Sequence, residues 1–426
     1  MKENNYKYSE ITLKEITDFE PGFNEYCNLN LNSNFELNAV QSSFYGDYQN
    51  ALDQATKRES IDHNPLKNIP ISGGDKAELI KSLETSIQDT ETDNATKASA
   101  QTILDLLNKP SAQQLFVNSR PVSAVNFIIT QSEKYHFTLI NEAHYNSQHR
   151  SFTSDLLKPL WDQGYRYLAL ETLNYQDSAI HERGYPIKSS GYYTKDSNFG
   201  NLVRKAIEIG YKLIPYESQD GHGGTLRDYN QAKNIYDQTW NKDKNGKVLI
   251  HAGYSHISEV GGPTYEPMGL QLKNLISQEI LTIDQVDMIG LLDTHTQHEY
   301  YQEACKKNDF SEPTIFLTKE KKVIVNPTIS LGIDIQVYHP KTKFIKGRPD
   351  WMYKAGTKQI PLNAALLKYK GNLVQAVKRN EVLDAVPVDQ FVISEGTIFL
   401  LNSGNYDLRL INCKGNMLAS LELTVY

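Results

Sequence analysis

The chain has 426 residues, of which 39% are hydrophobic and 22% are charged, and its formal net charge is -7. This length predicts two or three domains of about 100–200 residues, and the apolar content is enough for a sizeable core. Lysine and arginine do not cluster, which argues against nucleic-acid binding, and no apolar run approaches the roughly 18–20 residues that cross a bilayer.

The N-terminal segment MKENNYKYSE is polar, so we expect no signal peptide within this chain. A leader removed from the protein would leave no trace, and the sequence indicates neither a compartment nor an oligomeric state. The cysteines are Cys27, Cys305 and Cys413, which are odd in number and far apart. We therefore expect free thiols rather than a disulfide framework or a zinc site of the CxxC type.

Residues 1–128 are expected to form a helical N-terminal region. The segments KAELIKSLETSI (76–87) and ATKASAQTILDLLNK (95–109) are candidate helices, and Pro110 stops the second one. This region shows no motif with a chemical role, so we expect a structural role, such as a cap over the next domain.

Residues 129–358 are expected to form an α/β domain with a largely parallel sheet, because apolar runs alternate with amphipathic helices. The clearest helix covers 197–209, where Asp196 or Ser197 can cap the start and Gly210 follows the end. A second helix is expected from Thr225 onward. A third is expected over 148–163, where Pro159 predicts a kink or a late start.

Residues 359–426 are expected to form a small antiparallel β domain. Two alternating apolar runs, 406–410 and 421–425, flank the turn residues Lys414, Gly415 and Asn416, which is typical of a hairpin. The predicted fold class is thus an α/β central domain between a helical N-terminal region and a small all-β C-terminal domain.

Five apolar runs of the central domain each end in an acid, a histidine or both. The runs and the residues that follow them are Phe137–Ile140 with Glu142 and His144, Tyr165–Leu170 with Glu171, Leu213–Tyr216 with Glu217, Val248–Ile250 with His251 and His256, and Met288–Leu292 with Asp293 and His295. Polar residues follow strands in any protein, but five successive cases favour a functional cluster. The C-terminal ends of parallel strands share one rim of the sheet, where ligand sites form.

These segments together resemble the erythromycin-esterase-like group, which belongs with the ChaN-like haem-uptake proteins and the Tiki peptidases in one superfamily. The likeness covers residues 135–300 and is carried by NEAHYNSQHRSFTSDLLKPLWDQGYRYLALE, GYYTKDSNFGNLVRKAIEIGYKLIPYE, RDYNQAKNIYD and KVLIHAGYSHI. Its elements are Glu142 and His144, Glu171, an R-x-x-x-x-A-x-N helix with Arg227 and Asn234, and a G-x-x-H ending in His256. Asn141 stands where the group usually has glycine. The resemblance implies a hydrolase in which His and Glu assist the attack of water.

The candidate catalytic residues are His144, Glu142, Glu171, Glu217 and His256. His144 is the candidate general base, because an unperturbed imidazole accepts a proton near neutral pH. Glu142 or Glu171 would orient its ring, and His256 would protonate a leaving group. No G-x-S-x-G nucleophile elbow is present, which disfavours a serine hydrolase.

The candidate substrate-binding residues are Arg150, Arg227, His149, Tyr193 and Asn234. The two arginines could clamp an anionic group or an oxyanion, since guanidinium pairs with such groups through two parallel bonds. Glu217 would hold one of them, although Arg227 is equally well explained as a surface ion pair. His251 is better explained as a hydrogen-bonded core histidine, and His298 as a residue of an exposed loop.

Two alternatives concern cofactors, since none is required by the hydrolase hypothesis. A divalent metal held by His144, His256 and Glu171 would make an open catalytic site of the Tiki peptidase type. Haem or iron binding of the ChaN-like type is the second alternative, and it would need an apolar slot. The expected partner is a small-molecule substrate whose identity the sequence does not indicate.

Overall fold

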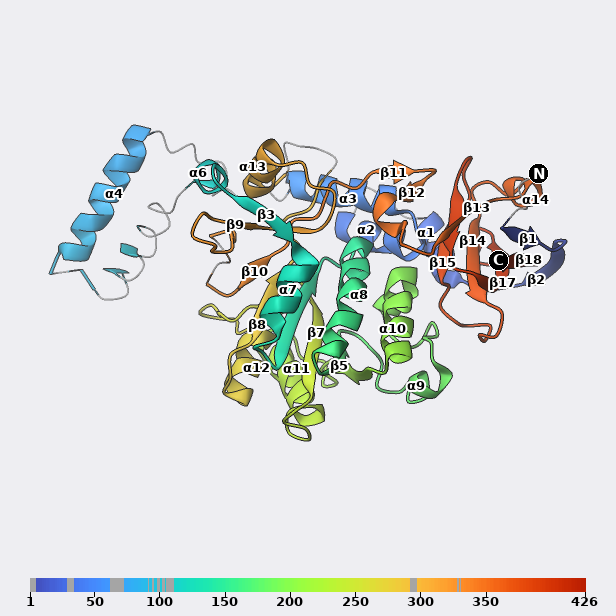
Figure 1. Ribbon diagram of the computed structural model, residues 1–426, viewed down its shortest axis with the longest axis horizontal. Helices are drawn as coiled ribbons and strands as arrows, with labels where there is room; N and C mark the ends of the chain where they lie inside the picture. The colour runs from blue at the N-terminus through green and yellow to red at the C-terminus, as the bar shows by residue number, and fades with distance from the viewer. Residues whose placement is uncertain are drawn as a thin grey trace.

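The computed structural model describes residues 5–28, 34–61, 73–90, 92–93, 96–97, 100–101, 104, 111–291, 297–327, 329 and 331–426. Its centre is a six-stranded parallel sheet in the order β10-β8-β4-β7-β5-β6 (Figure 1). The strands are β4 (Phe137–Glu142), β5 (Tyr165–Leu170), β6 (Lys212–Pro215), β7 (Lys247–Gly253), β8 (Leu281–Asp284) and β10 (Ile335–Gln336). The predicted α/β class of the central domain is confirmed.

Helices cover both faces of this sheet, so successive side chains of one strand enter different cores. In β4, Ile140 packs with the helices α7 (Ala124–Ser132), α8 (Ser147–Asp162) and α10 (Ser197–Ile209), which lie side by side in Figure 1. Leu139 packs on the other face with α11 (Gly224–Gln238) and α12 (Met268–Ile276). Burial on both faces explains why the strands are continuous apolar runs rather than alternating ones.

The three predicted helices of the central domain are present. Asp196 caps α10 by accepting from the backbone N–H groups of Asn198 and Phe199, and Gly210 ends it with a left-handed φ of 113°. Helix α8 runs through Pro159 without ending there, and it begins at the cap Asn146. Because Asn146 follows the end of β4 and Asp196 contacts Ser147 and Arg150, the two helix caps help to hold the loop after β4.

The fifth predicted strand is wrong. The described residues 288–291 form no strand, and the strand at this place in the sheet is β8, a few residues earlier. Met288, Ile289 and Leu291 are buried in side-chain clusters outside the sheet, which satisfies their apolar character without strand pairing. The residues expected after that run, 293 and 295, lie outside the described residues.

The C-terminal residues form the predicted antiparallel sheet, but the N-terminus joins it. The strand order is β1-β18-β17-β14-β15, and β2 also pairs with β18. The strands are β1 (Tyr6–Tyr8), β2 (Thr12–Ile16), β14 (Leu373–Lys378), β15 (Asp389–Val392), β17 (Gly404–Ile411) and β18 (Met417–Val425). The predicted helical N-terminal region therefore also contributes two strands, and both termini lie at this end of the molecule (Figure 1).

A disulfide joins Cys27 to Cys413, which corrects the expectation of free thiols at these two positions. Their separation of 386 residues hides the pairing in the sequence, because it depends on the N-terminal strands docking beside β18. Cys305 is free and exposed, as expected.

The first three N-terminal helices pack between the two sheets. Their shared cluster includes Phe44, Ala143 at the end of β4, and Leu373 of the C-terminal sheet. The helices of this region are α1 (Pro21–Cys27), α2 (Phe35–Phe44), α3 (Tyr48–Ile61), α4 (Gly73–Gln88) and α6 (Ala112–Phe116). Helix α4 confirms the prediction over 76–87, whereas the predicted helix over 95–109 falls largely outside the described residues.

The remaining elements are short connections around this frame. They are β3 (Arg120–Ser123), α9 (Ile180–Arg183), η1 (Tyr193–Lys195), η2 (Tyr254–Ile257), α13 (Glu299–Lys307), β9 (Thr314–Leu317), β11 (Phe344–Ile345), β12 (Arg348–Pro349), η3 (Asp350–Met352), β13 (Lys358–Pro361), α14 (Ala364–Leu367) and β16 (Ile398–Leu401). Among the described residues, no helix is both long enough and apolar enough to cross a lipid bilayer.

Candidate active site

Four neighbouring strands bring the predicted acids and histidines to one rim of the sheet. Glu142 ends β4 and is level with Gly253 of β7, while Glu171 follows β5 and Glu217 follows β6. The strand order β4-β7-β5-β6 makes these positions successive along the rim. Segments more than a hundred residues apart therefore reach one rim as predicted, and the common pocket expected between His144 and His256 stays a prediction.

Glu142 is the buried centre of this cluster. Arg150 donates to both of its carboxylate oxygens at 2.7 Å, and His251 Nε2 donates to Oε2 at 2.7 Å. Burial by itself would raise the pKa of Glu142, but Arg150 and His251 outweigh burial and hold that pKa well below its usual range. Glu142 is therefore an anion that only accepts hydrogen bonds.

Arg150 does not fit its predicted role as a substrate clamp. Its side chain is fully buried, and besides the paired bonds to Glu142 it donates to the backbone carbonyl of His144. Its remaining nitrogen lies 3.6 Å from Asp196, the cap of α10. Arg150 is the counter-ion of Glu142 and holds the loop after β4 in place.

His251 is the hydrogen-bonded core histidine that its position suggested. It is buried, and Thr153 Oγ1 lies 3.1 Å from its Nδ1. Because Glu142 can only accept, Nε2 donates to it, and in the neutral ring Thr153 then donates to Nδ1. His251 thus fixes Glu142 from the β7 side.

His144 is oriented by Glu142. Its Nδ1 lies 3.0 Å from Glu142 Oε1, and since that carboxylate is ionised, Nδ1 donates to it, which in the neutral ring leaves the lone pair on Nε2. The ring stacks on Tyr193 at a centroid distance of 4.2 Å and meets the edge of Tyr254 at 4.9 Å. Among the described residues, none makes a hydrogen bond to Nε2. The ring is therefore held in one orientation with a base at its tip.

Gly253 provides the space that the edge of the His144 ring occupies. A side-chain carbon on Gly253 would lie 2.5 Å from Nε2 and 3.0 Å from Glu171 Oε2. The imidazole and a second carboxylate therefore flank the same small residue. Here the glycine is needed for space, since its φ of -80° is ordinary.

Glu171 is the second buried carboxylate of the rim. It accepts from Arg227 at 2.9 Å and from the backbone N–H of Gly253 at 2.5 Å. Burial raises the pKa of Glu171, but His144, His256 and Arg227 together lower it below its ordinary value. Thr172 follows with a left-handed φ of 59°, which turns the chain sharply behind this carboxylate.

Arg227 lies at the exposed side of the cluster. It donates through Nε and Nη2 to Glu217 at 2.8 and 2.7 Å, and its Nη1 lies 3.1 Å from His256 Nε2. With the bond to Glu171, one N–H of Nη1 is left among the described residues. Arg227 can therefore offer a single donor to a substrate oxygen, not the predicted two-bond clamp.

His256 is a positioning residue for Arg227. A guanidinium can only donate, so Nε2 accepts, and Nδ1 donates to Asp228 Oδ2 at 2.8 Å. Burial lowers the pKa of His256, but the bond to Asp228 and the charge of Glu171 outweigh burial and raise it. Its predicted role as the acid for the leaving group does not fit, because neither nitrogen faces open space in this arrangement.

Two predicted substrate-binding residues serve the backbone instead. His149 is fully buried, and the Ala143 N–H donates to its Nδ1 at 3.0 Å, so it shapes the turn after β4 and cannot reach a substrate. Asn234 donates to the carbonyls of Tyr216 and Glu217 at 3.1 and 3.3 Å and holds the end of β6. Tyr193 is partly exposed, and its contact with a substrate stays a prediction.

The predicted metal set does not fit a cation. Arg227 already places a positive charge against Glu171 and His256, two of the three predicted ligands. Within the described ranges, no group of three or more histidine, cysteine, aspartate and glutamate side chains could hold a metal ion.

His298 is not an exposed loop residue but caps α13.

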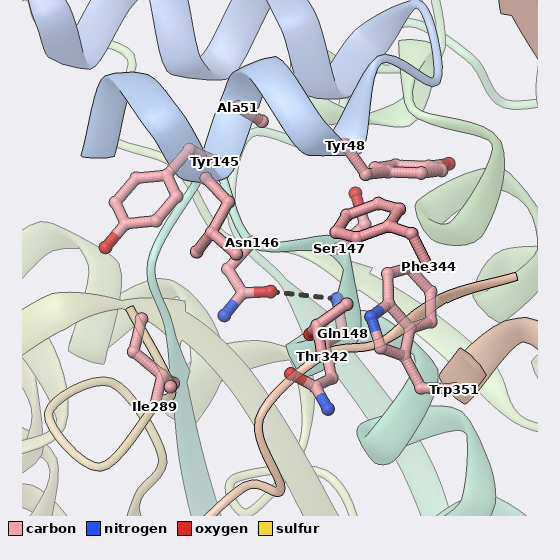
Figure 2. Close-up of a pocket in the computed structure, with 12 residues that line it drawn as sticks. Tyr48, Ala51, Tyr145, Asn146, Ser147, Gln148, Ile289, Thr342, Phe344 and Trp351 are labelled. Carbon is pink, nitrogen blue, oxygen red and sulfur yellow. Dashed lines mark hydrogen bonds between the residues drawn. The ribbon is translucent and has the colours of Figure 1, made fainter. Parts of the chain in front are cut away.

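A small pocket nearby is not the candidate site. Figure 2 shows it between α3 and the start of α8, with Tyr48, Asn146 and Trp351 around it. Its lining contains none of the predicted catalytic residues and touches the site only through the turn after β4. The pocket is a seam where the N-terminal helices meet the central domain.

Comparison with known proteins identifies no family. No protein-family model matches the sequence, and no curated protein matches it. Among solved structures, the type III effector HopBA1 aligns with a TM-score of 0.34 at 12% identity, over 53% of this chain and 98% of that protein. The C-terminal region of Pasteurella multocida toxin, described as having a thiol-protease-like catalytic triad, aligns at 0.29 and 15%, over 52% and 30%. The MARTX toxin effector domain RRSP of Vibrio vulnificus aligns at 0.27 and 13%, over 64% of each chain.

Proposed function

We propose that this protein is a hydrolase of ester, lactone or amide bonds in a small or medium substrate, with Glu142 and His144 as its catalytic pair. The observation that carries the proposal is the 3.0 Å contact between Glu142 and His144 Nδ1, which leaves Nε2 as a free base. A buried carboxylate that orients an imidazole is the arrangement that general-base catalysis requires.

The chemistry follows from the positions of these groups. His144 Nε2 takes a proton from water while the water oxygen attacks the substrate carbonyl. The imidazolium then lies between Glu142 and Glu171, and both charges stabilise it. The free N–H of Arg227 polarises the carbonyl oxygen. Collapse of the tetrahedral intermediate expels the leaving group, which takes the proton back from His144.

Tyr193 and Gly253 support this pair without taking part in proton transfer. Tyr193 stacks on the ring and restricts its rotation, and the missing side chain of Gly253 leaves room for the edge of the ring. The likeness to the erythromycin-esterase-like group stays a prediction, as does the haem-binding alternative, which a hemin titration without a Soret shift would remove.

The experiment is a screen of the purified protein with p-nitrophenyl esters, a six-membered lactone and a peptide anilide. We expect multiple turnover of at least one class and no covalent adduct in quenched samples by intact mass spectrometry, because water attacks directly. An acyl-enzyme mass would contradict direct water attack, and no hydrolysis of any class would remove the proposal.

A further inference from the structure

A second strand end on the same rim carries a carboxylate that has no counter-ion among the described residues. Asp284 ends β8, is 4% exposed, and accepts from Asn141 Nδ2 at 2.6 Å and Gln336 Nε2 at 3.0 Å. Among the described residues, no lysine, arginine or histidine lies within ion-pair distance of it. Amide donors alone compensate a buried charge poorly, so a cation from outside would stabilise it.

This carboxylate lies in the wall of a cavity of about 360 Å³. Ser255 and Ser258 add hydroxyl groups to the wall, and no described lining residue carries a positive charge. Val260 and Leu331 also line it and expose 47% and 79% of their surface, which gives the cavity an apolar mouth. Exposed apolar groups around a concave polar site are typical of a ligand site.

Tyr254 connects the cavity to the candidate catalytic pair. It lines the cavity, and its ring edge meets the His144 ring at 4.9 Å. Its backbone carbonyl accepts from Asn141 at 3.0 Å, and its hydroxyl donates to Glu36 at 2.7 Å. Tyr254 is therefore held as a fixed wall between the cavity and His144.

We propose that this cavity binds the cationic end of a small amphiphilic ligand, a protonated amine or a guanidinium, with its aliphatic part against the apolar mouth. That this ligand is part of the substrate rests on the proposed hydrolase function. A negatively charged rim also favours a cationic ligand. The carboxylates of the rim, Glu142, Glu171, Glu217 and Asp228, outnumber its two guanidinium groups, Arg150 and Arg227.

The binding experiment uses n-hexylamine as the probe, with hexan-1-ol and hexanoate as neutral and anionic controls of equal length, by calorimetry at pH 7.5. We expect hexylammonium to bind at about millimolar concentration, as suits so small a ligand, and at least about tenfold more tightly than hexanol or hexanoate. Equal binding of all three probes would overturn the proposal.

Variants locate the site. Asp284→Asn should reduce the preference for hexylammonium over hexanol to less than about twofold, while Asp162→Asn on the exposed end of α8 should leave it unchanged. Leu331→Lys, at an exposed position that tolerates substitution, should weaken hexylammonium alone, with Leu331→Gln as its neutral control. An unchanged preference in folded Asp284→Asn, or in Leu331→Lys if Asp284→Asn does not fold, would refute the site.

A kinetic arm separates this proposal from the proposed function. Hexylammonium should inhibit ester hydrolysis competitively, and His144→Gln should bind it as the wild type does. Binding without competition would show that the ligand is not part of the substrate. Absence of any hydrolysis would remove the hydrolase and leave the binding result to stand by itself.

Discussion

At the scale of single residues, the candidate site depends on how the charge of Glu142 is held inside the protein. Arg150 and His251 fill three of its contacts, and the fourth orients His144. A buried ion pair of this kind contributes little net stability when intact, but losing one partner strands the other charge. Its value here is geometric, because it fixes the ring that carries the base.

Arg150→Met tests this balance. Removing the guanidinium leaves Glu142 buried without its main counter-charge, so we expect a loss of about 3–5 kcal/mol in the free energy of unfolding. Urea denaturation of the variant and the wild type measures it. The exposed pair Lys158–Asp162 gives the control, since Lys158→Met should change stability by less than about 1 kcal/mol. A loss of similar size in both variants would contradict the assignment.

Gly253→Ala tests the space beside His144. The added methyl group would collide with the ring, so we expect the turnover found for the wild type to fall by at least about a hundredfold, because about 1 Å of misplacement has that effect. Overpacking should cost about 1–3 kcal/mol of stability. Gly223→Ala, at a glycine with nothing within 4 Å of an added carbon, is the matched control. Full activity in Gly253→Ala would show that Nε2 does not work in this space.

At the scale of elements, the caps of α8 and α10 bring their loops to the rim. Asp196 caps α10, accepts from Ser147 Oγ at 2.5 Å near the start of α8, and lies 3.6 Å from Arg150. One side chain thus joins two helices to the ion pair under His144. The sequence suggested the cap, because an aspartate preceded an apolar helical stripe. The contacts with Ser147 and Arg150 could not be predicted from local spacing.

Asp196→Ala should therefore cost more than an ordinary cap. We expect a loss of about 2–4 kcal/mol, against about 1 kcal/mol for a cap alone. Asp196→Asn keeps a cap oxygen and should lose less than half as much. Chemical denaturation of both variants measures their free energies of unfolding. Equal losses of stability in the two variants would mean that the charge of Asp196 does not matter.

Predictability differs among the strands for a physical reason. β4, β5 and β6 belong to apolar runs followed by glutamates, and β7 belongs to one followed by histidines, so both their type and their C-terminal ends could be predicted. β8 has four residues and ends in Asp284, and the more apolar run at 288–291 misled the prediction because its side chains pack in clusters outside the sheet. β1 and β2 are mostly exposed, with no apolar alternation to reveal them.

At the scale of the whole molecule, long-range contacts decide which predicted site residues can reach a substrate. The sequence places His149 and Arg150 close to Glu142 and His144. It does not reveal that the N-terminal helices and α10 bury these two side chains. His144, Glu171 and Arg227 could be predicted to meet because parallel strand ends share a rim. The docking of the N-terminus on β18, and the disulfide that follows from it, depend on partners hundreds of residues away.

Two buried histidines predict how stability responds to acid. The ring centroids of His149 and His339 lie 5.2 Å apart. Burial lowers the pKa of both side chains, and that of His339 to about 3. The unfolded chain takes up protons below about pH 6.5 that the folded protein refuses, so stability is lost as pH falls. The raised pKa of His256 has the opposite effect, with stability lost as pH rises.

The unfolding free energy should therefore decrease between about pH 6.5 and 4.5, by about 1.4 kcal/mol per pH unit for each buried histidine. His339→Gln removes one of the two and should flatten this slope by that amount. Urea titrations at several pH values measure it, and an unchanged slope in the variant would show that His339 is protonated in the folded protein.

The most direct test of the catalytic pair compares turnover and thermal stability in His144→Ala, with His136→Ala at the opposite end of β4 as the control. We predict that turnover disappears in His144→Ala while the melting temperature stays within a few degrees of the wild type, and that His136→Ala keeps its turnover. Retained turnover in His144→Ala, or a large fall in its melting temperature, would contradict the account, because His144 would then be dispensable or structural.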